Sequence, residues 1–274
     1  MVLGAVASVQ LGAALATTLF DELGPGGTVL LRTGFGAAIL LAIWRPALPR
    51  GARRPLLDTA LFAVALAAMN LSFYAALDRI PLGITVAFEF TGPFAVAVAG
   101  SRRALDAVWV ALAAGGIVLL SPLHGSLDAL GVAFALLAGS FWAAYIVLTA
   151  RIGRAFSGGE GLALGMSFST LLLLPYGVVA GGSDLGRPDL LAIGLAVGVL
   201  SSAIPYSLEL EALRRLAKGT FGVLMSLEPA VAALVGLVVL GQGLSATDTI
   251  AIAMVVVASA GALGTARVPA PVEA

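Results

Sequence analysis

Apolar segments long enough to cross a lipid bilayer follow one another along almost the whole sequence. The hydrocarbon core is about 30 Å thick and a helix rises about 1.5 Å per residue, so a transmembrane helix needs about 20 predominantly apolar residues. The composition agrees, because 60% of the residues are hydrophobic and only 11% are charged, whereas soluble domains carry about 25% charged residues. We therefore predict an all-α polytopic membrane protein with ten transmembrane helices. Their expected ranges are about 2–20, 27–44, 56–77, 81–100, 105–121, 128–149, 161–181, 189–210, 219–240 and 246–265.

The same composition excludes several classes of function. The formal net charge is zero, which gives no electrostatic footprint for nucleic acid. The sequence has no cysteine, which excludes disulfides and thiolate metal sites, and its single histidine, His124, falls in a short loop. We therefore predict neither a metal nor a cofactor. The glycine cluster at 158–161 lacks the G-x-x-x-x-G-K-[ST] pattern, so ATP hydrolysis by this chain is not expected.

The segment Pro81–Gly100 carries an acidic residue where the core of the bilayer is expected. Counted from Pro81 along a helix, Glu89 lies roughly 12 Å into the hydrocarbon slab. An ionised side chain at that depth costs at least about 2.5–3.5 kcal/mol on insertion scales. Glu89 is therefore expected to face a cavity, a partner or water. It is either a carboxylate that binds a substrate amine or titrates, or a paired structural acid.

The second half of the chain repeats this pattern. Its own acid, Glu228, stands beside Pro229, and its alternative role is to satisfy backbone that the proline leaves unpaired. Acidic, Gly/Pro-interrupted apolar segments in matching positions of two halves indicate a transporter binding site. We predict a first repeat at 1–122, a second repeat at 123–265 and a cytoplasmic tail at 266–274. A shift of 136 positions places Ala76, Leu77, Arg79, Gly83, Pro93 and Ala97 on Ala212, Leu213, Arg215, Gly219, Pro229 and Ala233, and Gly92 on Glu228.

The distribution of lysine and arginine predicts the orientation, because short cytoplasmic loops carry the excess of basic residues. With the amino terminus in the cytoplasm, only Arg79 and Arg187 fall outside, and Arg32 falls within the second span. Both termini are then cytoplasmic, and the odd number of spans in each repeat inverts the second repeat relative to the first. The basic residues on the inner side are Arg45, Arg50, Arg53, Arg54, Arg102, Arg103, Arg151, Arg154, Arg214, Arg215, Lys218 and Arg267.

Polar and aromatic residues inside the predicted spans are the candidates for substrate binding or coupling. Polar side chains within a membrane avoid lipid, so these residues either line a pathway or hydrogen-bond neighbouring helices. For Trp142 and Tyr145, which share a face of the sixth span, aromatic packing is the alternative. Arg32 either snorkels towards the outer face or pairs with Glu89 or with a substrate carboxylate. The candidates are Gln10, Asn70, Tyr74, Glu89, Thr91, Trp142, Tyr145, Tyr206 and Glu228.

A polar stripe marks the eighth predicted span. Ser202, Tyr206 and Glu209 follow one another at i, i+4 and i+7 and therefore share a helix face. Glu209 and Glu211 are expected to form structural ion pairs with the arginines that follow them, at 214 and 215. Trp44, at the cytoplasmic end of the second span, is interpreted as an interface anchor.

Several of these residues lie in longer motifs that resemble a known family. The motifs are similar to those of the bacterial threonine/homoserine exporters, which are EamA-domain members of the drug/metabolite transporter superfamily. The resemblance covers nearly the whole chain. It implies export of threonine, homoserine and related amino acids across the bacterial inner membrane, with protons as the proposed coupling partner. The motifs are V-A-F-E-F-T-G-P-F-A-V-A at 86–97, S-R-R-A-L-D-A-V-W-V at 101–110, P-Y-S-L-E at 205–209 and T-F-G-V-L-M-S-L-E-P-A at 220–230.

Three other functions can be compared with amino-acid export: export of another metabolite, a channel and a membrane enzyme. Within the superfamily, the alternative is an exporter of another small metabolite. A channel would need a ring of equivalent filter groups, and none stands out. A membrane enzyme would need clustered ligands or a nucleophile–base pair, so an enzyme is not expected. The sequence therefore predicts a secondary transporter that works by alternating access and has no nucleic-acid partner. The resemblance implies that its substrate is a small amino acid.

Overall fold

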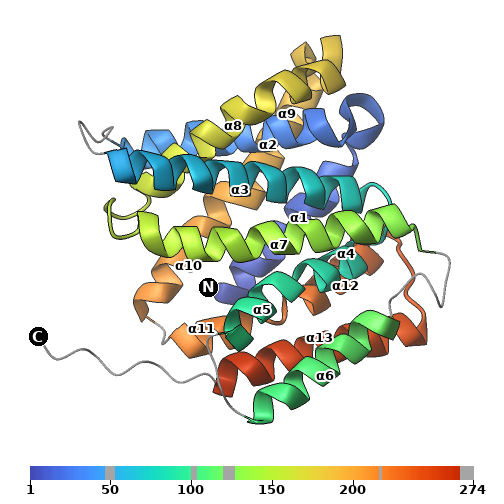
Figure 1. Ribbon diagram of the computed structural model, residues 1–274. Coiled ribbons are helices and arrows are strands. Elements are labelled where there is room, and N and C mark those ends of the chain that lie inside the picture. The colour runs from blue at the N-terminus through green and yellow to red at the C-terminus, as the bar shows by residue number, and fades with distance from the viewer. Residues whose placement is uncertain (47–52, 100–103, 120–126, 216–217, 266–274) are drawn as a thin grey trace, which may run out of the picture.

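The computed structural model describes residues 1–46, 53–99, 104–119, 127–215 and 218–265, and these residues contain helices and no strand (Figure 1). This confirms the predicted all-helical class. His124, the proposed tail at 266–274 and four of the basic residues used for orientation, at 50, 102, 103 and 267, lie outside the described residues.

The helices follow the predicted apolar segments along the chain. In the first half they are α1 (Val2–Thr17), α2 (Phe20–Trp44), α3 (Arg53–Leu77), α4 (Leu82–Glu89), α5 (Thr91–Ala99) and α6 (Ala104–Leu119). In the second half they are α7 (Ala129–Ile152), α8 (Glu160–Gly181), a short 3-10 helix η2 (Gly182–Gly186), α9 (Pro188–Gly198), a π-helical turn η3 (Val199–Ala203), α10 (Ile204–Arg215), α11 (Lys218–Met225), α12 (Glu228–Leu240) and α13 (Ala246–Thr265).

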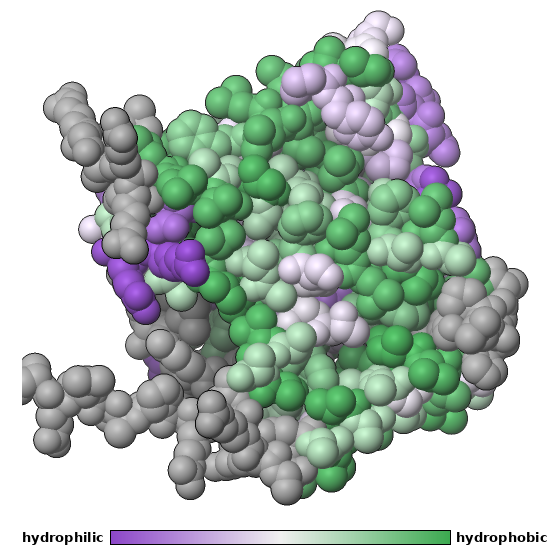
Figure 2. Space-filling view, viewed as in Figure 1, coloured by the Kyte–Doolittle hydropathy of each residue, from purple (hydrophilic) through white to green (hydrophobic). Residues whose placement is uncertain are grey.

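The length and composition of these helices make the chain a multi-pass membrane protein. Among the described residues, six helical stretches are long and apolar enough to cross a bilayer: 20–44, 56–77, 129–152, 160–186, 188–209 and 223–240. Four shorter apolar stretches accompany them, at 2–17, 82–96, 107–119 and 246–262. Large apolar side chains point outward, among them Val179, which is 82% exposed. Figure 2 shows a mainly hydrophobic face with hydrophilic residues gathered towards its left and right edges, where the helices of Figure 1 end.

The helices pack side by side around a central α1. The pairs α2 and α8, α3 and α7, α4 and α12, and α6 and α13 are in contact, and α1 contacts α9, α10 and α12. In Figure 1, α6 and α13 lie at one edge of the bundle, and α2, α8 and α9 lie at the opposite edge. Residues from α1, α3, α4, α7, α10 and α12 therefore meet in the interior.

Polar contacts join the helix ends on the side where α3 ends and α7 begins. Arg187 forms ion pairs with Glu22 and Asp189, each with an N–O distance of 2.8 Å. Arg79 lies 3.3 Å from Asp128. The Leu130 backbone N–H and Arg79 lower the pKa of the Asp128 carboxyl below its ordinary value.

Three of the apolar segments are interrupted near their centres, and each interruption lies close to a proline. A proline has no N–H, so the carbonyl four residues earlier loses its helical partner. Phe90 separates α4 from α5 just before Pro93, and Ser226 and Leu227 separate α11 from α12 just before Pro229. Turn η3 precedes Pro205. The interruptions bring backbone atoms and acidic side chains to the middle of the bundle.

Candidate functional site

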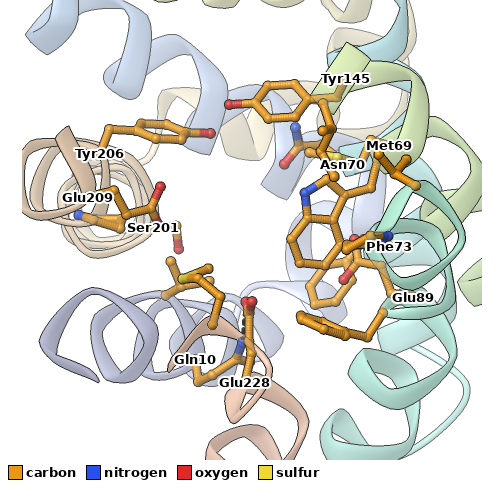
Figure 3. Close-up of a pocket in the computed structure, with 18 of the residues that line it drawn as sticks. Gln10, Met69, Asn70, Phe73, Glu89, Tyr145, Ser201, Tyr206, Glu209 and Glu228 are labelled. Carbon is orange, nitrogen blue, oxygen red and sulfur yellow. Dashed lines mark hydrogen bonds between the residues drawn. The ribbon is translucent and has the colours of Figure 1, made fainter. Parts of the chain in front are cut away.

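A cavity of about 400 Å³ lies in the middle of the bundle, lined by residues from both halves of the chain (Figure 3). Gln10 from α1 and Glu228 from α12 lie on one side of it, and Tyr206 and Glu209 from α10 lie on another. Seven of the nine predicted candidates line this cavity: Gln10, Asn70, Glu89, Trp142, Tyr145, Tyr206 and Glu228.

The other two candidates, Tyr74 and Thr91, lie behind the cavity wall. Tyr74 is completely buried on α3, and the Arg32 guanidinium lies 5.4 Å from the centre of its ring. Thr91 donates a hydrogen bond from its hydroxyl to the Phe88 carbonyl at 2.6 Å. Thr91 therefore satisfies the backbone beside the helix break, and neither residue is among those that line the cavity.

Gln10 and Glu228 form a buried pair that joins the two halves of the chain. Gln10 Nε2 donates to Glu228 Oε1 at 3.1 Å. Gln10 is 1% exposed and Glu228 is 7% exposed. The Gln10 side-chain oxygen, Oε1, and the other Glu228 oxygen, Oε2, have no hydrogen-bond partner among the described residues. The Glu228 carboxylate therefore bonds a side chain, which is not the backbone role considered for it beside Pro229. Two buried acceptor atoms of this pair are left without a partner among the described residues.

Glu89 is the last residue of α4 and is 8% exposed. The break at Phe90 places its carboxyl at the cavity wall, across from Glu228 in Figure 3. Among the described residues, no hydrogen bond or ion pair fixes this carboxyl. The positive charge of Arg32 acts on it through space.

Arg32 lines the cavity instead of snorkelling to the surface. Its Nη2 donates to the Ser201 carbonyl at 3.4 Å. That carbonyl lies four residues before Pro205, so the missing proline N–H leaves it available to Arg32. The proline in the eighth apolar segment thus helps to hold a cation from the second segment inside the bundle.

The ion-pair cluster expected for Glu209 and Glu211 forms only in part among the described residues, and the Arg214 side chain lies outside them. The expected pair forms for Glu211, whose Oε1 lies 2.5 Å from Arg215 Nη2. Glu209 lines the cavity instead, and no hydrogen bond or ion pair joins it to a described residue. The polar stripe with Ser202 and Tyr206 was the signal that could have assigned Glu209, because that stripe faces the interior.

Two glycines allow the close packing that positions Glu89. A Cβ atom on Gly92 would lie 1.9 Å from the Gly139 carbonyl oxygen, and a Cβ on Gly139 would lie 2.5 Å from the Glu89 carbonyl oxygen. Both distances are too short for a real side chain, so α7 approaches the α4–α5 break only because both positions are glycine. Trp142, one turn beyond Gly139, then packs edge-on against Phe90 with ring centres 5.4 Å apart.

Comparison with known proteins decides to which family this bundle belongs. Residues 129–264 match the EamA-like transporter family. The threonine/homoserine exporter RhtA of Escherichia coli K12 is 43% identical over 270 residues, which cover 97% of this chain and 91% of RhtA. RhtA of Salmonella typhimurium LT2 is 42% identical over 266 residues, which cover 96% and 90%. This chain belongs to the RhtA family of EamA-like transporters.

Membership of the RhtA family confirms the resemblance predicted from the motifs. It also confirms that the chain belongs with transporters and not with enzymes, because the relatives are named as exporters. A solved crystal structure with 19% sequence identity covers 95% of each chain with a TM-score of 0.66, which shows a shared fold and nothing more.

Proposed function

We propose that this chain exports small neutral amino acids such as threonine and homoserine from the cytoplasm. The observation that supports the proposal is the central cavity, where Arg32, Gln10 and Glu228 line one space and one oxygen each of Gln10 and Glu228 has no hydrogen-bond partner among the described residues. Secondary transporters bind their substrates near the bilayer midplane between their repeats. The family relatives in Escherichia coli and Salmonella are named for threonine and homoserine export.

The cavity offers groups that match each part of a zwitterionic amino acid. An arginine can bind a carboxylate through two parallel hydrogen bonds, which assigns the substrate carboxylate to Arg32. The ammonium group donates to Glu228 Oε2 and Gln10 Oε1, neither of which has a hydrogen-bond partner among the described residues. Asn70 Nδ2 already donates to the Leu66 carbonyl at 2.8 Å, which leaves Asn70 Oδ1 to accept from a substrate hydroxyl.

Ten spans in two inverted repeats, at 1–122 and 123–265, are the architecture that we propose for this function. The shift of 136 positions places Leu82–Glu89 on Lys218–Met225, so α4 falls on α11 and the two helix breaks coincide. The packing of α3 on α7 is matched by the packing of α1 on α9 and α10. Six pairs of cavity residues also match under the shift: Val9 and Tyr145, Gln10 and Ile146, Met69 and Pro205, Asn70 and Tyr206, Phe73 and Glu209, and Glu89 and Met225.

The balance of charge in the cavity supports proton coupling. Glu89, Glu209 and Glu228 line it, against Arg32 as the cation among its described residues. Excess negative charge inside the membrane is costly. In the empty carrier a proton on one carboxylate reduces this excess, and the substrate ammonium replaces that proton when the amino acid binds. We place the coupling proton on Glu89 first, because its carboxyl lies at the helix break, is largely buried, and is held by no hydrogen bond or ion pair among the described residues.

The proposed cycle runs in the bacterial inner membrane with both termini in the cytoplasm. The cavity opens to the cytoplasm, takes the amino acid and releases a proton, and then opens to the outside, where the amino acid leaves and a proton returns. Proton entry down its gradient thereby drives amino-acid export.

Efflux from proteoliposomes loaded with a panel of radiolabelled amino acids tests this function. The wild type should export threonine and homoserine faster with an inward proton gradient than without one. Glu89→Gln keeps the shape of the side chain and cannot ionise, so it should abolish the effect of the gradient while helical content stays normal. Export by Glu89→Gln at the wild-type rate and pH dependence would move the coupling role to Glu228. Absence of amino-acid efflux from the wild type would refute the function.

A further inference from the structure

A second cavity of about 180 Å³ adjoins the central one, and the function proposed above does not use it. Tyr145, Tyr206 and Glu209 line both cavities and therefore form the boundary between them. The second cavity lies at the end of the bundle where α2 and α7 end and α8 begins, away from the Arg187 ion pairs. We call it the vestibule, and its other walls include Trp44, Thr149, Phe156, Gly158, Gly159 and Ser207.

Glu209 is the acidic group of the boundary. Its neighbour two residues on, Glu211, is neutralised by Arg215, whereas no hydrogen bond or ion pair joins Glu209 to a described residue. The charge of Glu209 acts on the hydroxyl groups of Tyr145 and Tyr206. A carboxylate beside two tyrosines suits an ammonium group, which can form a charge-assisted hydrogen bond with the acid and lie against the aromatic rings.

The outer wall of the vestibule is a contact between the two halves of the chain. A Cβ atom on Gly158 would lie 2.5 Å from the Trp44 ring, and one on Gly159 would lie 2.4 Å from Trp44 Nε1. The indole therefore packs directly on the backbone of the loop between α7 and α8. Gly158 also has a φ of +53°, a conformation that favours glycine. The glycine cluster and Trp44 thus close the vestibule together, which gives Trp44 a partner in the protein beyond the anchoring role expected from the sequence.

We propose that the vestibule is a second binding site, through which the substrate amino acid reaches the central cavity from the cytoplasm, with Glu209 binding its ammonium group. The inference rests on the proposed export function. The path then leads from one acid to the next, because Glu209 and Glu228 line the same central space and their charges act on each other. The hydroxyls of Tyr145 and Tyr206 bond each other and must part for the ammonium group to pass, and this group has a carboxylate nearby before and after that step.

Transport kinetics give the first test. Glu209→Gln should raise the KM for internal threonine about 10-fold or more, because a charge-assisted hydrogen bond is lost, while the maximal rate changes less than about two-fold. Glu209→Asp should recover part of the affinity. Glu211→Gln is the matched control on the same helix and should leave the KM unchanged. Equal KM values for Glu209→Gln and Glu211→Gln would overturn the proposal.

Thiol labelling gives a second test that does not depend on transport. The chain has no cysteine, so Ser207→Cys, which lines the vestibule and not the central cavity, provides a single reactive site. Threonine should slow the labelling of Ser207→Cys by a soluble maleimide. This protection should persist when Glu228→Gln is added and disappear when Glu209→Gln is added. Loss of protection with Glu228→Gln would show that threonine acts from the central cavity and would overturn the vestibule site.

The two proposals fail in different ways. A wild-type protein that releases no amino acid from proteoliposomes refutes the export function. A wild-type protein that exports threonine, with no protection at Ser207→Cys and no change of KM in Glu209→Gln, refutes the vestibule alone.

Discussion

The glycine contact beside Glu89 can be tested by adding a single methyl group. Gly139→Ala places a Cβ 2.5 Å from the Glu89 carbonyl oxygen, whereas ordinary contacts begin at 3.4 Å. Helix α7 must therefore retreat from the α4–α5 break by about 1 Å, because protein interiors do not compress. Overpacking of this kind costs about 1–3 kcal/mol. A misplacement of about 1 Å in a site can reduce activity about 100-fold.

We expect Gly139→Ala to lower the rate of threonine efflux by about 10- to 100-fold, because the shift of α7 carries Trp142 and Tyr145 away from the opposite cavity wall. Gly34→Ala is the matched control, since its Cβ would meet Thr170 at 3.7 Å, an ordinary contact. Alanine favours a helix over glycine by about 1 kcal/mol, so the control should be neutral or stabilising. Efflux from proteoliposomes and thermal unfolding in detergent measure both effects. Equal efflux rates for the two variants would refute this account of the contact.

Three further predictions concern recognition, orientation and stability. Arg32→Gln should weaken threonine binding about 10-fold or more and leave the binding of threoninol, which has no carboxylate, unchanged in calorimetry. The predicted orientation, with both termini in the cytoplasm, can be tested by cysteine labelling in intact cells. Ser183→Cys should react with an impermeant reagent and Ser157→Cys should not, although both serines are exposed. A third suitable position, at 126, lies outside the described residues. The lowered pKa of Asp128 means that its contacts stabilise the fold above the ordinary aspartate pKa of about 3.9, and that this stabilisation is lost as the pH falls through the lower folded-state value. Asp128→Asn should therefore lower the melting temperature at pH 7 and have no effect once the pH is below the lowered pKa of Asp128.

The helical class and most of the candidate site could be predicted because the bilayer restricts polar residues so strongly. A glutamate or glutamine in the middle of an apolar segment has to face the interior, and Gln10, Glu89 and Glu228 all line the cavity. Thr91 does not, since a hydroxyl can satisfy itself on its own backbone, here at Phe88. The sequence does not indicate whether the Thr91 hydroxyl faces the cavity or bonds the backbone of its own segment.

The residues that sequence reasoning left open or misplaced depend on contacts between distant segments. Arg32 could point either to the outer surface or to the interior. It points to the interior, where it bonds the Ser201 carbonyl, which lacks its helical partner because of Pro205. Glu209 stood next to both arginines and the polar stripe, and only the rotation of α10 about its axis separates it from Glu211. Local spacing gives the face of a helix but not the neighbour that the face meets.

The interrupted helices have a mechanical consequence for a carrier. A continuous helix is stiff and tilts as one body, so a movement of its end at one membrane surface also moves its end at the other surface. The break at Phe90 separates α4 from α5 beside Glu89, and the break at Ser226–Leu227 separates α11 from α12 beside Glu228. Each half-helix can then tilt independently of the other half, about a break that lies beside the proposed substrate cavity. One membrane surface can then open while the other stays closed, and the proposed substrate cavity lies where the half-helices meet.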